Sequence, residues 1–247
     1  MLRPFRADLH VHTCLSPCAE LDMTPRQIVD AAKGKGLDIL AITDHNSAEN
    51  TEAARRAASG SGLVVLSGME ITSSEEVHVL ALFEGGEDVM RMQEVIYENL
   101  PPGENDEELY GEQVVVNEFD EVMGFNTRLL ITATRLSLEA LVSMIHSCGG
   151  LCVASHIDRE AFSVISQLGF IPGDAGFDAL EFSSRLERDE AEERFGHLKT
   201  FPWVSSSDAH YIADVGGRTV TFTMEEPTLD EIRLALRVAD GRRTDWP

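Results

Sequence analysis

Histidines and carboxylates recur in short polar clusters along this sequence, and their types and spacing are suited to metal binding. Six of the eight histidines lie where a predicted strand ends or beside an acidic residue. Imidazole nitrogens and carboxylate oxygens are ligands for zinc, manganese and iron. The six histidines are His10, His12, His45, His78, His156 and His210.

The first cluster has a potential ligand at every second position. Alternation along a strand places Asp8, His10 and His12 on one face, while Leu9 and Val11 face the other way. Two imidazoles two residues apart on one strand face can bind the same cation. An H-x-H alone is often incidental, so this cluster needs support from the rest of the chain.

That support comes from three further acidic positions. Asp44 and Asp208 lie in Thr-Asp-His and Asp-Ala-His, and Glu70 lies near the end of a predicted strand. Each alone is weak, because Asp-His pairs also cap helices and a single glutamate is usually solvated. Their joint occurrence at successive strand ends predicts a polynuclear metal centre. The remaining histidines, His146 and His197, lie in or after predicted helices and are expected to be surface or packing residues.

Short apolar strands alternate with helical segments along the chain, which predicts a βα-rich, mostly parallel α/β architecture. In a parallel βα-barrel the carboxyl ends of the strands meet at one rim, where these side chains would converge. Seven or so units around one core predict a barrel formed by a single domain. The predicted strands are 5–11, 37–42, 63–67, 77–83, 151–155, 178–182, 203–206 and 219–223. The predicted helices are 25–36, 47–58, 87–99, 137–147, 160–168, 187–194 and 228–239.

The alternation breaks between residues 84 and 134. A helix is expected at 87–99, but 101–106 is polar and rich in residues that break regular structure. We interpret 84–134 as an insertion within one domain spanning 1–247. Since substrate selection commonly lies in loops above a rigid scaffold, this segment is expected to shape specificity.

Composition limits the partners. The chain has 20 basic and 43 acidic residues and a formal net charge of −23. Extended nucleic acid and anionic membrane surfaces both need clustered basic residues, so neither is expected as a partner. No apolar run approaches the ~20 residues of a membrane span. The start of the sequence lacks the apolar stretch of a secretion signal, so a cytoplasmic location is expected.

The clusters occur in a recognisable order: D-x-H-x-H, T-D-H, a strand-end glutamate, two isolated histidines and a terminal D-x-H. In this the sequence resembles the PHP (polymerase and histidinol phosphatase) family, from Asp8 to His210. The resemblance implies a distorted (βα)7, TIM-like barrel that hydrolyses phosphoesters with two or three divalent ions, which are zinc, manganese or iron.

The resemblance also implies which residues hold each ion. The first ion would take His10, His12, Glu70 and Asp208. The second would take Glu70, His78 and His156, and the third His45 and His210. Asp8 would orient an imidazole from behind, because ligating histidines usually donate their other N–H to a carboxylate or carbonyl. Asp44 could do the same for its neighbours.

One position departs from the family pattern. The third ion usually has a histidine or aspartate ligand five or six residues after H-x-H, where this chain has Pro17 and Cys18. Proline offers no side-chain ligand, whereas a thiolate binds zinc or iron well, so Cys18 is the predicted ligand. Glu20 and Asp22 are nearby substitutes, and a site with only two ions is the other alternative.

The implied function is metal-dependent hydrolysis of a phosphoester in a small phosphorylated metabolite, a nucleotide or a very short oligonucleotide. Metal ions would supply the attacking hydroxide near neutral pH. Arg159 and Arg185 are candidates to grip the distal phosphate, because guanidinium groups suit bidentate phosphate contacts. An exposed ion pair at the barrel rim is an equal alternative for each. The oligomeric state is left open.

Two other classes remain possible from the sequence. An amidohydrolase-type metal hydrolase also places H-x-H on its first barrel strand, but often bridges its metals with a modified lysine at a strand end. The lysines here, Lys33, Lys35 and Lys199, lie at or after helices, so Glu70 would have to bridge. A non-catalytic metal- or ligand-sensing barrel is the third class, although such a protein would be expected to lose motif residues.

Overall fold

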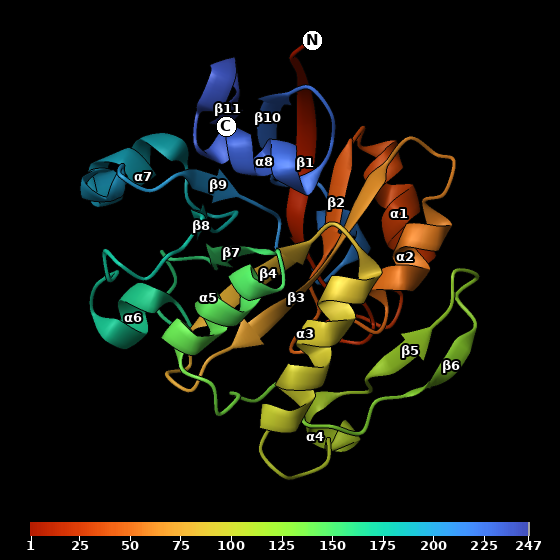
Figure 1. Cartoon of the computed structure of the whole chain (residues 1–247). Coiled ribbons are helices and arrows are strands. Elements are labelled where there is room, and N and C mark those ends of the chain that lie inside the picture. The colour runs from red at the N-terminus through yellow and green to blue at the C-terminus, as the bar shows by residue number, and fades with distance from the viewer. Residues whose placement is uncertain (247) are drawn as a thin grey trace.

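The computed structural model describes residues 1–246, and its centre is a nine-stranded sheet curved into a nearly closed barrel (Figure 1). The strand order is β11-β10-β1-β2-β3-β4-β7-β8-β9, and the edge strands β9 and β11 lie against each other. The strands are β1 (Arg3–Val11), β2 (Ile39–Ile42), β3 (Val64–Thr72), β4 (His78–Phe83), β7 (Leu151–Ala154), β8 (Ala179–Phe182), β9 (Trp203–Ser205), β10 (Val220–Met224) and β11 (Arg243–Asp245). The predicted TIM-like α/β barrel is confirmed as the fold class.

The sheet is less parallel than the sequence indicated. Strands β1, β2 and β3 are mutually parallel, as are β7, β8 and β9, but β4 runs antiparallel to both of its neighbours. Strand β10 is antiparallel to β1 and to β11. The reason for β4 is local, since only 73–77 joins it to β3, and a parallel partner would need a crossover of a dozen or more residues.

Helices cover the outside of the barrel between successive strands. Thr228 caps α8, with its hydroxyl accepting a hydrogen bond from the Glu231 N–H, whereas Thr24 makes no side-chain cap before Pro25. The predicted helix at 160–168 is shorter in the structure. The helices are α1 (Pro25–Gly34), α2 (Thr51–Ala57), α3 (Gly86–Asn99), α4 (Glu107–Tyr110), α5 (Leu138–Ser147), α6 (Val164–Leu168), α7 (Arg188–Phe195) and α8 (Leu229–Leu236). Short 3-10 turns occupy Gly196–Leu198, Ile212–Asp214 and Ala239–Gly241.

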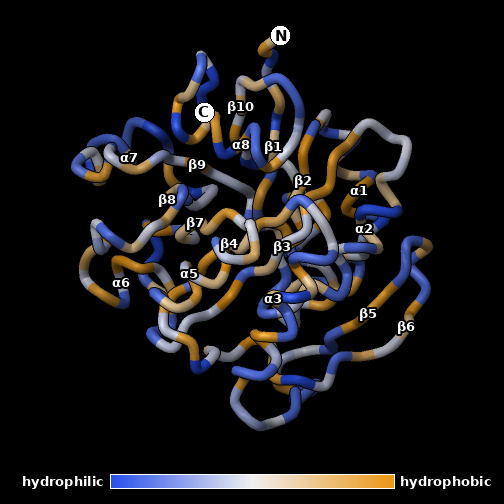
Figure 2. The backbone as a smooth tube through the Cα atoms, in the orientation of Figure 1, coloured by the Kyte–Doolittle hydropathy of each residue, from blue (hydrophilic) through white to orange (hydrophobic). Residues whose placement is uncertain are grey.

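The central strands carry the core, as the hydrophobic colour along them in Figure 2 shows. All six residues of β4 are buried, as expected for a strand in the middle of a covered sheet. One large apolar cluster links the strands with α3, α5 and α8, and a smaller one lies between α1, α2 and the first strands. This packing makes the barrel a rigid support for side chains at its rim.

Segment 84–134 contains more than one kind of structure. Helix α3 packs on β3 and β4 and so belongs to the helical layer of the barrel. Beyond it, α4 is followed by a separate two-stranded sheet of β5 (Val114–Val116) and β6 (Val122–Phe125).

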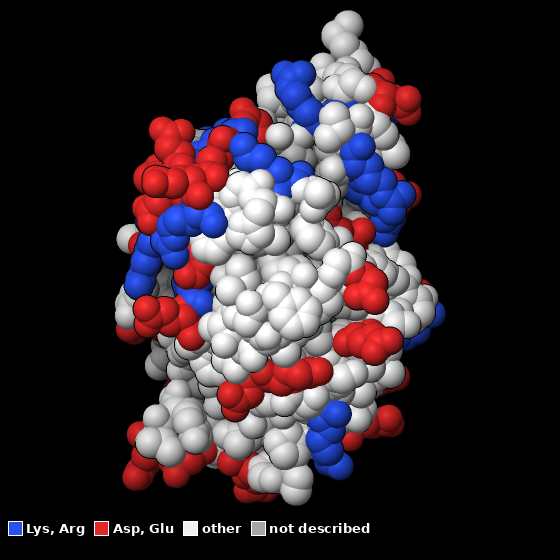
Figure 3. Space-filling model, turned by 90° about the vertical axis from the view of Figure 1, so that its left-hand side faces the viewer, with Lys and Arg blue, Asp and Glu red and all other residues white. Residues whose placement is uncertain are grey.

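The surface reflects the excess of acidic residues. On the face in Figure 3, groups of acidic side chains surround a broad uncharged area, and basic side chains are fewer and dispersed. None of the helices within residues 1–246 is both long and apolar enough to cross a membrane.

Candidate metal centre

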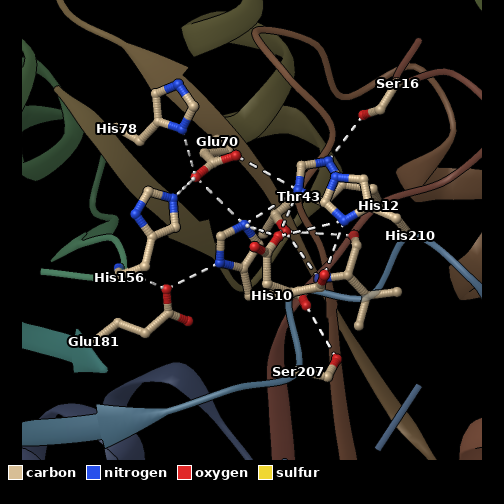
Figure 4. A network of polar contacts seen from close by, with 12 residues as sticks. His10, His12, Ser16, Thr43, Glu70, His78, His156, Glu181, Ser207 and His210 are labelled. Atoms are coloured by element: carbon tan, nitrogen blue, oxygen red, sulfur yellow. Dashed lines mark hydrogen bonds and ion pairs between the residues drawn. The ribbon is translucent and has the colours of Figure 1, made fainter. Parts of the chain in front are cut away.

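The predicted ligands converge at one rim of the barrel (Figure 4). His10 lies near the end of β1 and His12 directly follows this strand. The ends of β2, β7 and β9 are followed by His45, His156 and the 208–210 segment. His78 is the first residue of β4, yet it lies at the same rim because this strand runs backwards, with His78 paired to Thr72 at the end of β3. The antiparallel strand thus brings a strand start to the place where the other strands end.

Two imidazole nitrogens face each other at the centre of the cluster. The Nε2 atoms of His10 and His12 lie 3.2 Å apart, and both lie 3.3 Å from Oδ1 of Asp208. Oxygens of Glu70 lie 3.4 and 3.5 Å from the same two nitrogens. Two ligands of one tetrahedral zinc ion, each about 2.0–2.1 Å from it, are about 3.3 Å apart. These spacings therefore match a set of ligands around a cation.

The hydrogen bonds behind these imidazoles fix which nitrogen carries the proton. Ser16 donates its hydroxyl proton to Asp44 (2.7 Å), so its oxygen must accept from Nδ1 of His12 (3.0 Å). The carboxylate of Glu181 likewise accepts from Nδ1 of His10 at 3.0 Å. The Nε2 atoms of both rings therefore point at each other, and either a proton, which the raised pKa of His10 favours in the metal-free protein, or a metal ion must lie between them.

Glu70 is shared between several imidazoles. Its Oε1 lies 3.0 Å from Nδ1 of His78 and 3.2 Å from Nε2 of His156, and its Oε2 lies 3.3 Å from Nδ1 of His45. That nitrogen of His45 is buried and has no hydrogen-bond partner among residues 1–246. A carboxylate with imidazoles around both oxygens has the disposition of a bridging ligand.

A third group of donors includes the predicted cysteine. One donor atom from each of His12, Cys18, His45 and His210 lies within 4.8 Å of the others, and Sγ of Cys18 is 3.2 Å from Nε2 of His210. The substitutes considered from the sequence, Glu20 and Asp22, belong to none of the donor groups within residues 1–246. His45 also groups with Glu70 and His78, in the place that the sequence analysis gave to His156, which belongs to none of the groups within residues 1–246. The three groups are contiguous because they share His12 and His45.

Burial and charge shift the pKa values of the cluster in opposite directions. Burial lowers the pKa of His12 to about 4, helped by the neighbouring His210, and lowers that of His45 well below its usual value. His10 is equally buried, but the carboxylates of Glu181, Asp208 and Glu70 outweigh burial and raise its pKa. The imidazoles of His78, His10 and His156 likewise hold the pKa of Glu70 well below its ordinary value, although Glu70 is buried. The centre thus favours ionised carboxylates and mostly neutral imidazoles, the forms that bind metals.

Two residues of the cluster have strained backbones. The φ angle is +28° at His156 and +51° at Asp208, in a region that side chains other than glycine rarely occupy. Such strain persists only where the surrounding structure holds it, and it is common at functional sites.

The structure corrects the role predicted for Asp8. Its carboxylate accepts hydrogen bonds from the N–H and hydroxyl of Ser207 and from the N–H of Gly216, and its side chain touches no imidazole. Burial raises the pKa of Asp8 to about 6. The residue anchors the loop that carries Asp208. Sequence alternation placed Asp8 on the correct face but could not show that this loop lies between it and the cluster.

Asp44 acts on an imidazole only through another residue. Its two oxygens accept from the N–H and hydroxyl of Thr13 and from the hydroxyl of Ser16, which in turn holds His12. Burial raises the pKa of Asp44 to about 6. Asp44 therefore positions His12 indirectly, through the hydroxyl of Ser16.

The group that does orient His10 is Glu181, which the sequence analysis missed. It lies in β8, is 2% exposed, and also accepts from the backbone N–H of His156 at 3.1 Å. In the sequence, this role could have been suspected only because a glutamate stands inside the apolar segment Ala-Leu-Glu-Phe. The two excluded histidines lie outside the cluster, with His146 bonded to Asp178 and His197 exposed.

The two predicted phosphate-binding arginines have different surroundings. Nη2 of Arg159 lies 2.5 Å from Oδ2 of Asp208, which ties its guanidinium to the edge of the cluster. Arg185 contacts no cluster residue and lines a cavity of about 1000 Å³ beside it. No residue of 84–134 lines this cavity, so the predicted role of that segment in specificity gains no support there.

Comparison with known protein families gives two matches. A model of the PHP domain matches residues 8–164, and a model described as PHP-associated matches 189–240. An uncharacterised protein of Methanocaldococcus jannaschii is 34% identical over 86 residues, which cover 32% of this chain and 50% of that protein. The chain therefore spans about half the length of this curated relative.

Solved structures share the fold at low identity. Endonuclease Q from Pyrococcus furiosus has a TM-score of 0.73 and 20% identity, over 98% of this chain and 58% of that chain. Another structure of Endonuclease Q contains a 27-mer duplex substrate with an abasic lesion at the active site. A proposed metal-dependent phosphoesterase from Bifidobacterium adolescentis has a TM-score of 0.59 and 21% identity, over 94% and 96% of the two chains.

Proposed function

The chain belongs to the PHP domain family, and on this premise we propose that it is a metal-dependent phosphoesterase that acts on a small phosphorylated substrate. The observation that carries the proposal is the pair of buried Nε2 atoms of His10 and His12. They face each other at 3.2 Å between two carboxylates. A metal ion bound there would replace the proton that the raised pKa of His10 otherwise favours between the two rings.

The cluster offers donors for two or three divalent ions. The first would be held by His10, His12, Glu70 and Asp208, the second by Glu70, His78 and His156, and the third by His45, His210 and Cys18. Their donor set of imidazole, carboxylate and one thiolate suits zinc, iron or manganese. When bound, such ions polarise phosphate oxygens and supply a hydroxide nucleophile near neutral pH.

The chain's own residues prepare this site for the substrate. Glu181 and Ser16 hold the rings of His10 and His12 in one orientation, so little reorganisation is needed on binding. Arg159, fixed by Asp208, keeps other N–H groups for a phosphate oxygen at the edge of the cluster. A strongly acidic protein can then hold an anionic group at a locally positive centre.

The composition favours a small substrate over an extended nucleic acid. With 43 acidic and 20 basic residues, the chain has few groups to neutralise a phosphate backbone. The duplex in Endonuclease Q is a property of that protein, whose similarity to this chain is one of fold.

The amidohydrolase alternative lacks its bridging lysine. Lys33 pairs with Asp30, Lys35 donates to a backbone carbonyl, and Lys199 pairs with Glu192. Glu70, which has imidazoles near both of its oxygens, would bridge the ions instead. A phosphoesterase is therefore the better-supported class.

Turnover and metal content together test the proposal. The protein should hydrolyse p-nitrophenyl phosphate with added manganese or zinc, and replacing His10 or Asp208 by alanine should lower kcat at least about 100-fold. The exposed His197→Ala variant is the matched control. Metal binding without turnover would instead indicate a non-catalytic metal- or ligand-sensing barrel. A protein that binds no metal would refute the metal centre as a whole.

A further inference from the structure

The cavity beside the metal centre is lined by charges of both signs. Of its four carboxylates, Asp158 accepts hydrogen bonds from Ser183 and Asp208 pairs with Arg159; the other two belong to Glu160 and Asp214. The cavity opens on the cluster, because Cys18, Asp208 and His210 form part of its wall. Three arginines from three separate segments line the same space: Arg159, Arg185 and Arg218.

Arg218 is buried without a close carboxylate. It is 9% exposed, its Nε donates to the hydroxyl of Ser205 at 3.1 Å, and its Nη2 donates to the carbonyl of Leu186 at 2.7 Å. The nearest acidic oxygen belongs to the exposed Glu187, 3.6 Å from Nη1. Burying a charge is costly unless it is paired, and a long ion pair to a solvated carboxylate compensates little. The guanidinium of Arg218 therefore has two neutral acceptors and a single long ion pair to an exposed carboxylate.

Arg185 is also available to bind an anion. It is exposed, and no carboxylate of residues 1–246 lies within 4.0 Å of its guanidinium. Its loop is held in place, since the N–H and hydroxyl of Ser183 both donate to Asp158 at 2.7 and 2.6 Å. Other arginines, such as Arg135 and Arg237, also have no carboxylate within 4.0 Å among residues 1–246, but Arg185 differs from them in lining the cavity.

We propose that Arg185 and Arg218 form a subsite for a second anionic group of the substrate. Arg159 contacts the cluster through Asp208, whereas the other two arginines line the cavity without touching any cluster residue. The second anion would therefore bind away from the reacting phosphate. The substrate class is a phosphoester whose other end carries a phosphate or a carboxylate. This inference rests on the phosphoesterase function proposed above.

Two pairs of substrates test the subsite. Glycerol 3-phosphate and 3-phosphoglycerate differ by a carboxylate, and fructose 6-phosphate and fructose 1,6-bisphosphate differ by a phosphate. We expect kcat/KM to be about 10- to 100-fold higher for the doubly anionic member of one pair, as one or two charge-assisted hydrogen bonds would give. The pair that shows the larger ratio identifies the anion.

Variants then assign the preference to the arginines. Arg185→Met, at an exposed position, and Arg218→Lys, which keeps the buried charge, should each bring the ratio towards one. Arg237→Met, outside the cavity, should leave the ratio as in the wild type. A ratio near one in the wild type, or a preference that survives both changes, would overturn the subsite while leaving the phosphoesterase intact.

A binding measurement separates this inference from the proposed function. If no phosphoester is hydrolysed, the phosphoesterase proposal fails, but titration calorimetry of the metal-loaded protein with the same pairs still reports the ratio of dissociation constants. A ratio of about tenfold or more that falls in Arg185→Met would support the anion subsite. Equal affinities would refute it.

Discussion

Replacing Cys18 by serine should remove about one metal ion per chain. The third donor group contains His12, Cys18, His45 and His210, but His12 also belongs to the group formed with His10 and Asp208, and His45 to the group formed with Glu70 and His78. The third ion therefore has two donors of its own, Cys18 and His210, and Cys18 is the only anion in the group. Without the thiolate, only imidazoles remain to hold a divalent cation.

The loss of affinity should be large. Removing a group that merely orients a ligand costs about 10- to 100-fold in metal affinity, so removing the anionic ligand itself should cost more. Partial desolvation, together with the carboxylates of Glu70 and Asp208, raises the pKa of the Cys18 thiol. The thiol would therefore be deprotonated only when a cation takes its proton's place.

Cobalt provides the assay, because a thiolate bound to Co²⁺ gives a charge-transfer absorption in the near ultraviolet. Metal-free protein titrated with Co²⁺ should develop this band, and Cys18→Ser should lose it together with one equivalent of bound metal. Cys148→Ser is the matched control, since Cys148 lies half-buried against the core, outside the donor groups. A band and a metal content unchanged in Cys18→Ser would show that the sulfur is not a ligand.

Three other perturbations test the surroundings of the cluster. Glu181→Gln should lower the affinity for metal about 10- to 100-fold, because the ring of His10 loses the carboxylate that orients it. The exposed Glu193→Gln variant is the control and should bind metal as the wild type does. Metal titrations that give the same affinity for both variants would refute the orienting role of Glu181. Phe162 stacks on His78, with ring centroids 4.6 Å apart, and has a φ of +58°. Because glycine adopts this backbone angle more easily than alanine, urea denaturation should show Phe162→Ala to be about 1 kcal/mol less stable than Phe162→Gly. Equal stabilities of the two variants would contradict this backbone conformation. Chelation of the metals should lower the free energy of unfolding by about 2.7 kcal/mol for each bound ion, relative to protein held at metal concentrations 100-fold above Kd. An unchanged transition would mean that the folded cluster holds no metal.

The ligand types could be predicted because each one is marked locally. A strand places His10 and His12 on one face through the period of two, and this periodicity survives in β1. Glu70 was identified although β3 was predicted to end at residue 67 and continues to Thr72. The strand boundary was wrong, but the polar residue within an apolar segment was still informative.

The direction of β4 differs from what a mostly parallel sheet would give. His78 stands at the start of the predicted strand 77–83, so a parallel strand would have placed it at the opposite edge from the other candidate ligands. A start and an end of neighbouring antiparallel strands lie at the same edge, so His78 lies beside the end of β3. The family resemblance, and not the strand pattern, named His78 as a ligand.

The groups that orient the ligands could not be predicted in the same way. Glu181 lies 171 residues from the imidazole that it holds, and Ser16 connects His12 to Asp44 through a hydroxyl that no sequence pattern marks. Hydrogen-bond partners depend on which loops pass behind the ligands, and loop paths follow from tertiary packing. Asp8 was assigned to an imidazole for this reason, although Ser207 and Gly216 lie in front of it.

Arg218 illustrates the same limit for charge. From the sequence it is one of the few basic residues of an acidic chain, and nothing distinguishes it from Arg188 or Arg242, which pair with carboxylates on the surface. Only the structure shows that Arg218 is buried with Nε and Nη2 on neutral acceptors and beside a cavity that opens on the cluster. Because a buried charge needs compensation, the environment of an arginine carries the functional information that its identity lacks.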